Sequence, residues 1–106
     1  MKFYFRKREL EIRQSVYKNN NRVALVIVDV ETGENFATLT VNVTNVNYPE
    51  DVFAIKTWSE NEEVAEVIFN TDAFEDTGRR AENGHVIIEF WRLKPPYSLS
   101  HIPFVT

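Results

Sequence analysis

The sequence has no cysteine and only three glycines and four prolines among 106 residues. Without cysteine there is neither a disulfide framework, which many small secreted domains need, nor a thiolate metal site. The three glycines stand far apart, so no glycine-rich loop for phosphate groups is present. The longest apolar run, residues 23–28, is far shorter than the roughly 20 residues of a membrane-spanning helix. We therefore expect a cytoplasmic protein that does not enter a membrane.

What is present indicates one folded domain. Hydrophobic residues make up 43% of the chain and aromatic residues 13%, which is enough apolar surface to build a core. The length suits a single domain. We expect a domain over residues 1–94, followed by an apolar tail over residues 95–106 that packs on the domain or on a second chain.

The charge is unevenly distributed along the chain. Residues 1–22 hold seven basic and two acidic side chains, whereas residues 59–78 hold seven acids and no base. Basic side chains on an N-terminal ribbon protect an edge strand from unwanted pairing, and this interpretation is favoured over nucleic-acid binding because the whole chain has a net charge of −4. The sequence thus makes a nucleic-acid partner unlikely. The acidic segment is more often a solvated surface that keeps a small domain soluble, although it can also mark a charged binding face.

Alternating and β-branched residues predict most of the strands. Strands are expected near residues 2–6 and 10–17, with a turn at 19–21. The apolar run that follows predicts an interior strand buried on both faces, and the turn at 31–34 joins it to a strand over 36–43. A short strand over 52–57 comes next, and the last strand runs from about His85 to Leu93. This last strand is expected to start near Gly84 without a preceding hairpin partner, because the polar segment 76–83 is expected to be a loop.

One helix is predicted between the fifth and the last strand. Ser59 followed by Glu62 fits a capping box, in which the serine side chain caps the helix and the glutamate reaches back. Val64, Val67 and Ile68 lie at helical spacing. The expected fold is therefore α+β, a mainly antiparallel sheet of five or six strands in the order β-β-β-β-β-α-β, with the helix on one face. The other face is expected to be partly open, with Thr38, Thr40, Asn42 and Trp91 as candidate contacts for a ligand.

No arrangement of residues typical of catalysis is found. The two histidines are isolated, no glycine-x-serine-x-glycine motif occurs, and the acids do not match a calcium-binding loop. The sequence predicts no catalytic residue, no metal site and no cofactor, and it disfavours an enzyme. An acidic surface can instead occupy a basic groove of a partner protein. The candidate partner-binding residues are Glu60, Glu62, Glu63, Glu66, Asp72, Glu75 and Asp76.

Part of the chain resembles a family of small uncharacterised proteins carried by bacterial phages and integrative elements. The resemblance covers roughly residues 20–93 and is strongest in the Phe-Ala-Thr-Leu-Thr-Val-Asn segment at 36–42, which follows a Gly-Glu turn. The segment from Lys94 onward departs from the family, which tends to stop soon after its last strand. The resemblance implies no catalytic or binding residue. It implies an accessory protein that binds a host protein, for example to inhibit a defence nuclease.

Several functions stay open at this point. The leading hypothesis is a protein-binding accessory module that uses the acidic surface. The alternatives are a small-ligand or nucleotide-binding domain that uses the open sheet face, a structural homodimer sealed by the tail around Ile102, Phe104 and Val105, and a hydrolase that uses converging carboxylates.

Overall fold

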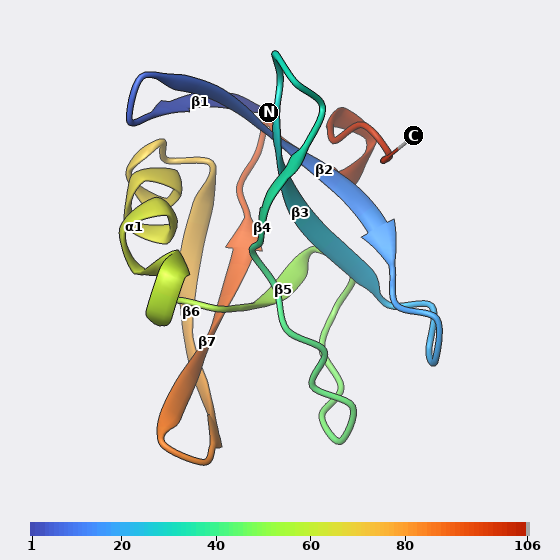
Figure 1. Ribbon diagram of the computed structural model, residues 1–106. Coiled ribbons are helices and arrows are strands. Elements are labelled where there is room, and N and C mark those ends of the chain that lie inside the picture. Colours follow the sequence, from blue (N-terminus) through green and yellow to red (C-terminus); the bar gives the residue numbers. More distant parts are fainter. Residues whose placement is uncertain (106) are drawn as a thin grey trace.

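Two antiparallel sheets and one helix make up the computed structural model, which describes residues 1–105 (Figure 1). The first sheet has the strand order β1-β2-β3-β4 and the second has the order β5-β7-β6. The α+β class and the antiparallel pairing are confirmed. The strands are β1 (Lys2–Phe5), β2 (Arg8–Val16), β3 (Val23–Asp29), β4 (Asn35–Thr38), β5 (Val52–Ile55), β6 (Phe74–Asn83) and β7 (Val86–Leu93).

The predicted interior strand is confirmed as β3, which lies between β2 and β4. Its side chains are buried on both faces, since Leu25 and Ile27 are fully buried on one side and Ala24 and Val28 are nearly so on the other. A continuous apolar run is what such a position requires, because both faces are largely covered and only Val23 and Val26 are partly exposed.

The hairpin of β3 and β4 is also confirmed, but β4 is much shorter than expected. Regular pairing ends at Thr38, and the alternation expected over 36–43 fails at Leu39 and Thr40, which are both buried. The reason is that the chain leaves the first sheet here and crosses to the second. Thr40 pairs with Ile55 in an isolated antiparallel bridge, and the backbone N–H of Val41 donates to the carbonyl of Ala54 at 3.0 Å. The two sheets are therefore connected by backbone pairing between residues 40–41 and residues 54–55.

The polar segment expected to be a loop is a strand, β6, and this expectation was wrong. It pairs with β7 and adds a seventh strand, so the order is β-β-β-β-β-α-β-β. Gly84 and His85 form the two-residue turn between Asn83 and Val86, so Gly84 does close a hairpin. β6 is an edge strand with mostly exposed residues, and a bulge at 77–79 with Gly78 at φ +83° interrupts its register. An edge strand exposed on both sides carries no apolar alternation, which explains why the pattern did not reveal it.

The helix α1 (Glu62–Asn70) starts later than the capping box predicted. Ser59 lies in a short 3-10 helix, η1 (Ser59–Asn61), at φ +55°, and neither helix has a side-chain cap. A tertiary contact replaces the local one, because the Asn61 side chain is fully buried and its Nδ2 donates to the carbonyl of Thr38 at 2.7 Å. No helix among the described residues is long and apolar enough to cross a membrane.

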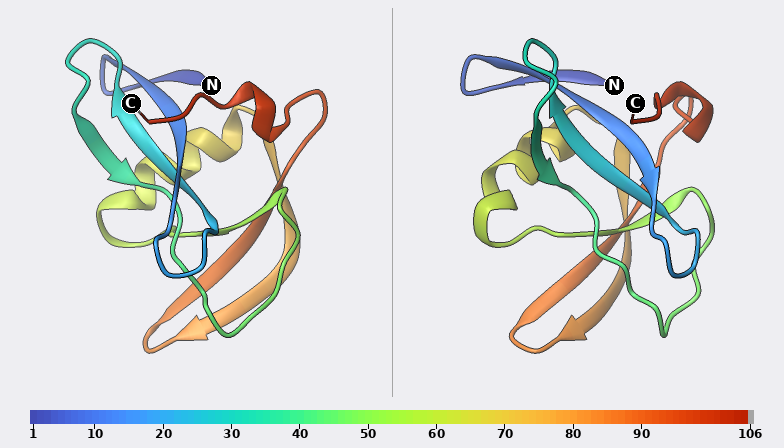
Figure 2. Two further views of the ribbon diagram at one scale, coloured as in Figure 1. Left: turned by 90° about the vertical axis from the view of Figure 1, so that its right-hand side faces the viewer. Right: turned by 45° about the vertical axis from the view of Figure 1, so that its right-hand side comes forward.

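The main core lies between the helix and both sheets. Val64, Ala65 and Ile68 of α1 pack with residues of both sheets, including Leu10 and Phe53. A second, smaller cluster lies on the other face of β5 and β7 and includes Phe90. The start of the chain and the segment over 103–105 lie near each other at one end of the molecule, and the tip of the β6–β7 hairpin lies at the opposite end (Figure 2).

The segment after β7 lies along β2. The 3-10 helix η2 (Leu99–His101) precedes Ile102, whose side chain is 2% exposed and belongs to the main core. Gln14 of β2 holds this segment, because its Nε2 donates to the carbonyls of Leu99 and Ile102 at 2.8 and 2.7 Å. Residues 103–105 then pair with Gln14 through their backbone. Of the residues proposed to seal a dimer, Ile102 is buried in its own domain, whereas Phe104 and Val105 are exposed.

Candidate functional site

A groove lies between α1 and the β6–β7 hairpin and holds several of the predicted acids. Its volume is about 240 Å³, and we call it the acidic groove. Its lining residues come from the segment after β5, from one face of α1 and from the hairpin, and are Thr57, Glu62, Ala65, Glu66, Phe69, Asp76, Glu89 and Trp91.

Regular secondary structure brings these side chains together. On α1, the groove residues Glu62, Ala65, Glu66 and Phe69 are related in pairs by spacings of three and four (62 with 65 and 66, 69 with 65 and 66), so they share a face. On the hairpin, Asp76 of β6 is paired with Trp91 of β7. Glu89 lies two residues before Trp91 and so points to the same side of the sheet. The helix face and the sheet face thus present their carboxylates to one space.

The carboxylates of the groove differ in how they are neutralised. Both oxygens of Asp76 accept hydrogen bonds from Arg80, at 2.8 and 2.6 Å, and this guanidinium holds the pKa of Asp76 below its usual range. Glu89 accepts a hydrogen bond from the Trp91 indole Nε1 at 3.0 Å and lies 3.8 Å from Arg80. Among residues 1–105, no basic side chain forms an ion pair with Glu62 or Glu66.

The floor of the groove is aromatic. The rings of Phe69 and Trp91 are 4.9 Å apart between centroids, and Trp91 also packs on Phe74 at 6.0 Å. Trp91 is only 3% exposed, whereas Phe69 is 37% exposed, so Phe69 is the ring that an incoming group would touch. An open aromatic ring bordered by carboxylates favours a cation with an apolar stem, such as an arginine or lysine side chain.

The other predicted acids lie outside the groove and are paired. Glu60 bonds to Lys56 at 2.5 Å, and the Lys56 ammonium lowers the pKa of Glu60. Glu63 pairs with Arg6 of the β1–β2 turn. Farther along, Asp72 pairs with Lys94 at 2.7 Å and Glu75 with Arg92 at 3.5 Å. The seven predicted acids therefore do not form one surface, and only Glu62, Glu66 and Asp76 line the groove.

The candidate open-face residues are dispersed. Thr38 is exposed at the end of β4, but Thr40 is buried and its hydroxyl is bonded to Tyr17 Oη at 2.9 Å. Asn42 bonds to Asn19 and Asn20 of the β2–β3 turn. Trp91 belongs to the other sheet and is buried at the groove floor. These four side chains do not form one open face, because the chain crosses between the sheets at Thr40.

Sequence reasoning missed Glu89. The available signal was its position as the single acidic residue within the apolar run of the last strand, since a charge at such a place calls for a partner or an opening to water. No group of three or more histidine or acidic side chains within residues 1–105 is placed to hold a metal ion.

Comparisons of the chain with protein-family models, with curated proteins and with solved structures give no significant match. The resemblance of residues 20–93 to proteins of phages and integrative elements therefore stays a prediction.

Proposed function

We propose that this protein is a non-enzymatic protein-binding module whose acidic groove takes a basic side chain of its partner. The observation that carries the proposal is the pair Glu62 and Glu66, which border the exposed Phe69 ring without an ion pair among residues 1–105. Two carboxylates without a base leave a negative potential in a partly enclosed space, where charge complementarity raises both association rate and selectivity.

The chemistry of the groove selects the kind of partner. A lysine or arginine side chain would place its charge between the carboxylates and its stem on Phe69. A neutral apolar residue would leave these carboxylates partly desolvated without a compensating ion pair or hydrogen bond. The accessory role on a phage or mobile element, and a host defence protein as the target, are further parts of the proposal that rest on the sequence resemblance.

The test compares two doubly substituted variants in affinity capture of partners from a bacterial lysate. The variant Glu62→Lys with Glu66→Lys reverses the groove. The variant Glu60→Lys with Glu63→Lys changes the net charge equally in the same helical segment but outside the groove. We expect the control and the wild type to retain the same partner and the groove variant to lose it.

A small competitor checks the chemistry of the contact. N-acetyl-arginine amide carries only a side-chain charge and is expected to displace the captured partner, whereas the neutral citrulline analogue is not. Equal capture by the wild type and the groove variant would exclude the groove as the binding surface. Equal competition by the two analogues would exclude recognition of a cation.

A structural homodimer is the competing proposal, and exposed apolar side chains at the end of β2 and at positions 104 and 105 favour it. Val16, Phe104 and Val105 are 52%, 66% and 40% exposed. If these side chains bury one another between two copies, Phe104→Ser will convert a dimer to a monomer in light scattering. A monomeric wild type at high concentration would exclude this proposal.

A further inference from the structure

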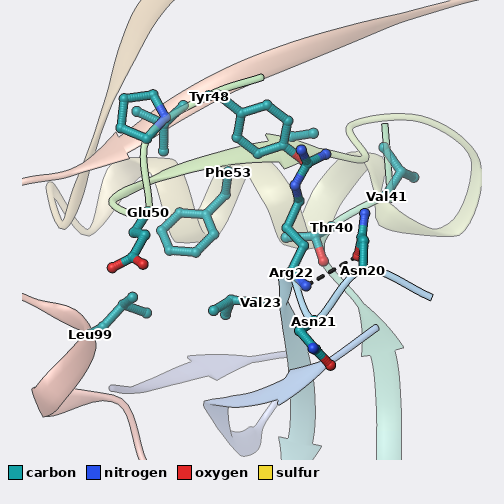
Figure 3. A pocket seen from close by; sticks show the side chains of 13 residues that line it. Asn20, Asn21, Arg22, Val23, Thr40, Val41, Tyr48, Glu50, Phe53 and Leu99 are labelled. Atoms are coloured by element: carbon teal, nitrogen blue, oxygen red, sulfur yellow. Dashed lines mark hydrogen bonds between the residues drawn. The ribbon is translucent and has the colours of Figure 1, made fainter. Parts of the chain in front are cut away.

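A second cavity lies between the two sheets, away from the acidic groove, and we call it the inter-sheet cavity. Its volume is about 310 Å³, and it shares no lining residue with the groove. It is bordered by the turn after β2, the start of β3, the loop over 48–50, β5 and the η2 segment (Figure 3). A space of this size is within the range of small-molecule pockets.

The floor of this cavity is apolar. Val23 of β3 and Leu99 of the segment after β7 are half-buried and line it, and the Phe53 ring of β5, which is 2% exposed, belongs to the main core beside it. A ligand with an apolar body would therefore find a matching surface, and that body would replace water at little cost in polar desolvation.

Arg22 supplies a fixed positive charge. Its guanidinium stacks on the Tyr48 ring at 4.1 Å and donates to the carbonyls of Val43 and Val46. A guanidinium has five N–H groups, so three remain for a ligand. No carboxylate of residues 1–105 forms an ion pair with Arg22, and its side chain is already held in place. Binding an anion there would cost little side-chain ordering.

Glu50 supplies the opposite charge. It lines the same cavity, is exposed, and forms no ion pair within the described part of the chain. In Figure 3 the Phe53 ring lies between the Glu50 carboxylate on one side and Arg22 on the other. The cavity thus presents a negative and a positive group on opposite sides of an apolar floor.

From this arrangement we infer that the inter-sheet cavity binds an elongated small zwitterion, of which a di- or tripeptide is the simplest kind. Its carboxylate bonds to Arg22, its ammonium group to Glu50, and an apolar side chain lies against Val23 and Leu99. A simple anion gains nothing from Glu50, and a simple cation gains nothing from Arg22.

The probes that test this inference are the tripeptide Ala-Leu-Ala and two blocked forms, one with an acetylated amino end and one with an amidated carboxyl end. Titration is followed by backbone amide shifts in nuclear magnetic resonance spectra. We expect Ala-Leu-Ala to shift the amides of residues 20–23 and 50–54. Each blocked form is expected to bind about tenfold more weakly, which is the usual effect of losing one charged hydrogen bond.

Two variants of the protein test which charged residue binds which end of the peptide. Glu50→Gln is expected to weaken Ala-Leu-Ala and the amidated form while leaving the acetylated form unchanged. Arg22→Gln is expected to weaken binding of Ala-Leu-Ala and of the acetylated form while leaving binding of the amidated form unchanged. Arg79→Gln is the matched control, because Arg79 also stacks on an aromatic ring, that of Phe90 at 5.1 Å, and donates to a loop carbonyl but does not line the cavity.

Three results would overturn the inference: no shifts at millimolar peptide, equal binding of the free and blocked forms, or shifts confined to other surfaces. Glu50 is an exposed loop residue, so Glu50→Gln keeps the test decisive even if Arg22→Gln proves unstable. The acidic-groove variant Glu66→Gln should leave the peptide shifts unchanged, which separates this site from the proposed protein-binding surface.

Discussion

Replacing Gln14 with leucine tests whether one side chain holds the segment after β7 on the domain. Gln14 is 6% exposed, and its Nε2 is the donor to both the Leu99 and Ile102 carbonyls. Leucine keeps the volume and the backbone pairing with residues 103–105 but removes both bonds. At about 1 kcal/mol for each bond, we expect the free energy of unfolding to fall by about 2 kcal/mol, and by about 4 kcal/mol if both carbonyls stay dry.

Ile102→Ala provides the second half of a double-mutant cycle. Because Ile102 is a fully buried core residue, its truncation is expected to cost about 2–5 kcal/mol. If the segment docks as one unit, the double variant will lose less than the sum of the two single losses, with a coupling of about 1 kcal/mol or more.

Urea unfolding followed by circular dichroism measures all four proteins, and Ser15→Ala, next to Gln14 on the other face of β2, is the control. We expect the control to change stability by less than about 0.5 kcal/mol. The reasoning is refuted if Gln14→Leu falls within the same limit, or if the two substitutions are additive.

Three further predictions concern single positions. Arg80 lowers the pKa of Asp76 from its usual 3.8, so the charged Asp76 stabilises the fold above about pH 4. This stabilisation is lost as the pH falls through the lowered pKa of the folded state. When the free energy of unfolding is measured at decreasing pH, the Asp76→Asn variant should therefore lose less stability below pH 4 than the wild type. Asn61→Asp places a buried carboxylate against the Thr38 carbonyl, so the free energy of unfolding measured in urea should fall by at least about 3 kcal/mol at pH 7. Part of this loss should be recovered in acid, where the carboxylate is protonated. An equal loss at both pH values would contradict the prediction. Gly78→Ala should cost about 1 kcal/mol because φ is +83°, although the added Cβ meets no atom within 4 Å, and a neutral result in thermal unfolding would mean that the bulge relaxes.

The sequence predicted those strands and helices in which burial requires apolar residues at regular positions along the chain. The run ending at Val28 predicts an interior strand because a strand covered on both faces has only apolar neighbours. Val64 and Ile68 at helical spacing likewise predict α1, in which both side chains are buried. β6 gave no such signal, because Phe74 is the only fully buried residue among its ten.

The parts that could not be predicted depend on contacts between distant segments. Ser59 has the right neighbours for a capping box, but the bond from Asn61 to the Thr38 carbonyl sets the start of the helix. Thr40 fits an exposed alternation, but the crossing to Ile55 buries it. Similarly, the sequence grouped seven acids along one segment, and only the pairing of β6 with β7 brings Asp76 and Glu89 to the same groove.

The hydrogen bonds from Gln14 to the segment after β7 also bear on when the chain can finish folding. The two carbonyls that Gln14 binds lie 85 and 88 residues later in the sequence. During synthesis, β1, β2 and β3 emerge first and can pair through short turns, yet β2 keeps a polar side chain facing the core with no partner until Ile102 has left the ribosome. Closing so long a loop is slow relative to hairpin formation. The core beside β2 is therefore complete only once the segment over 99–102 has docked on Gln14.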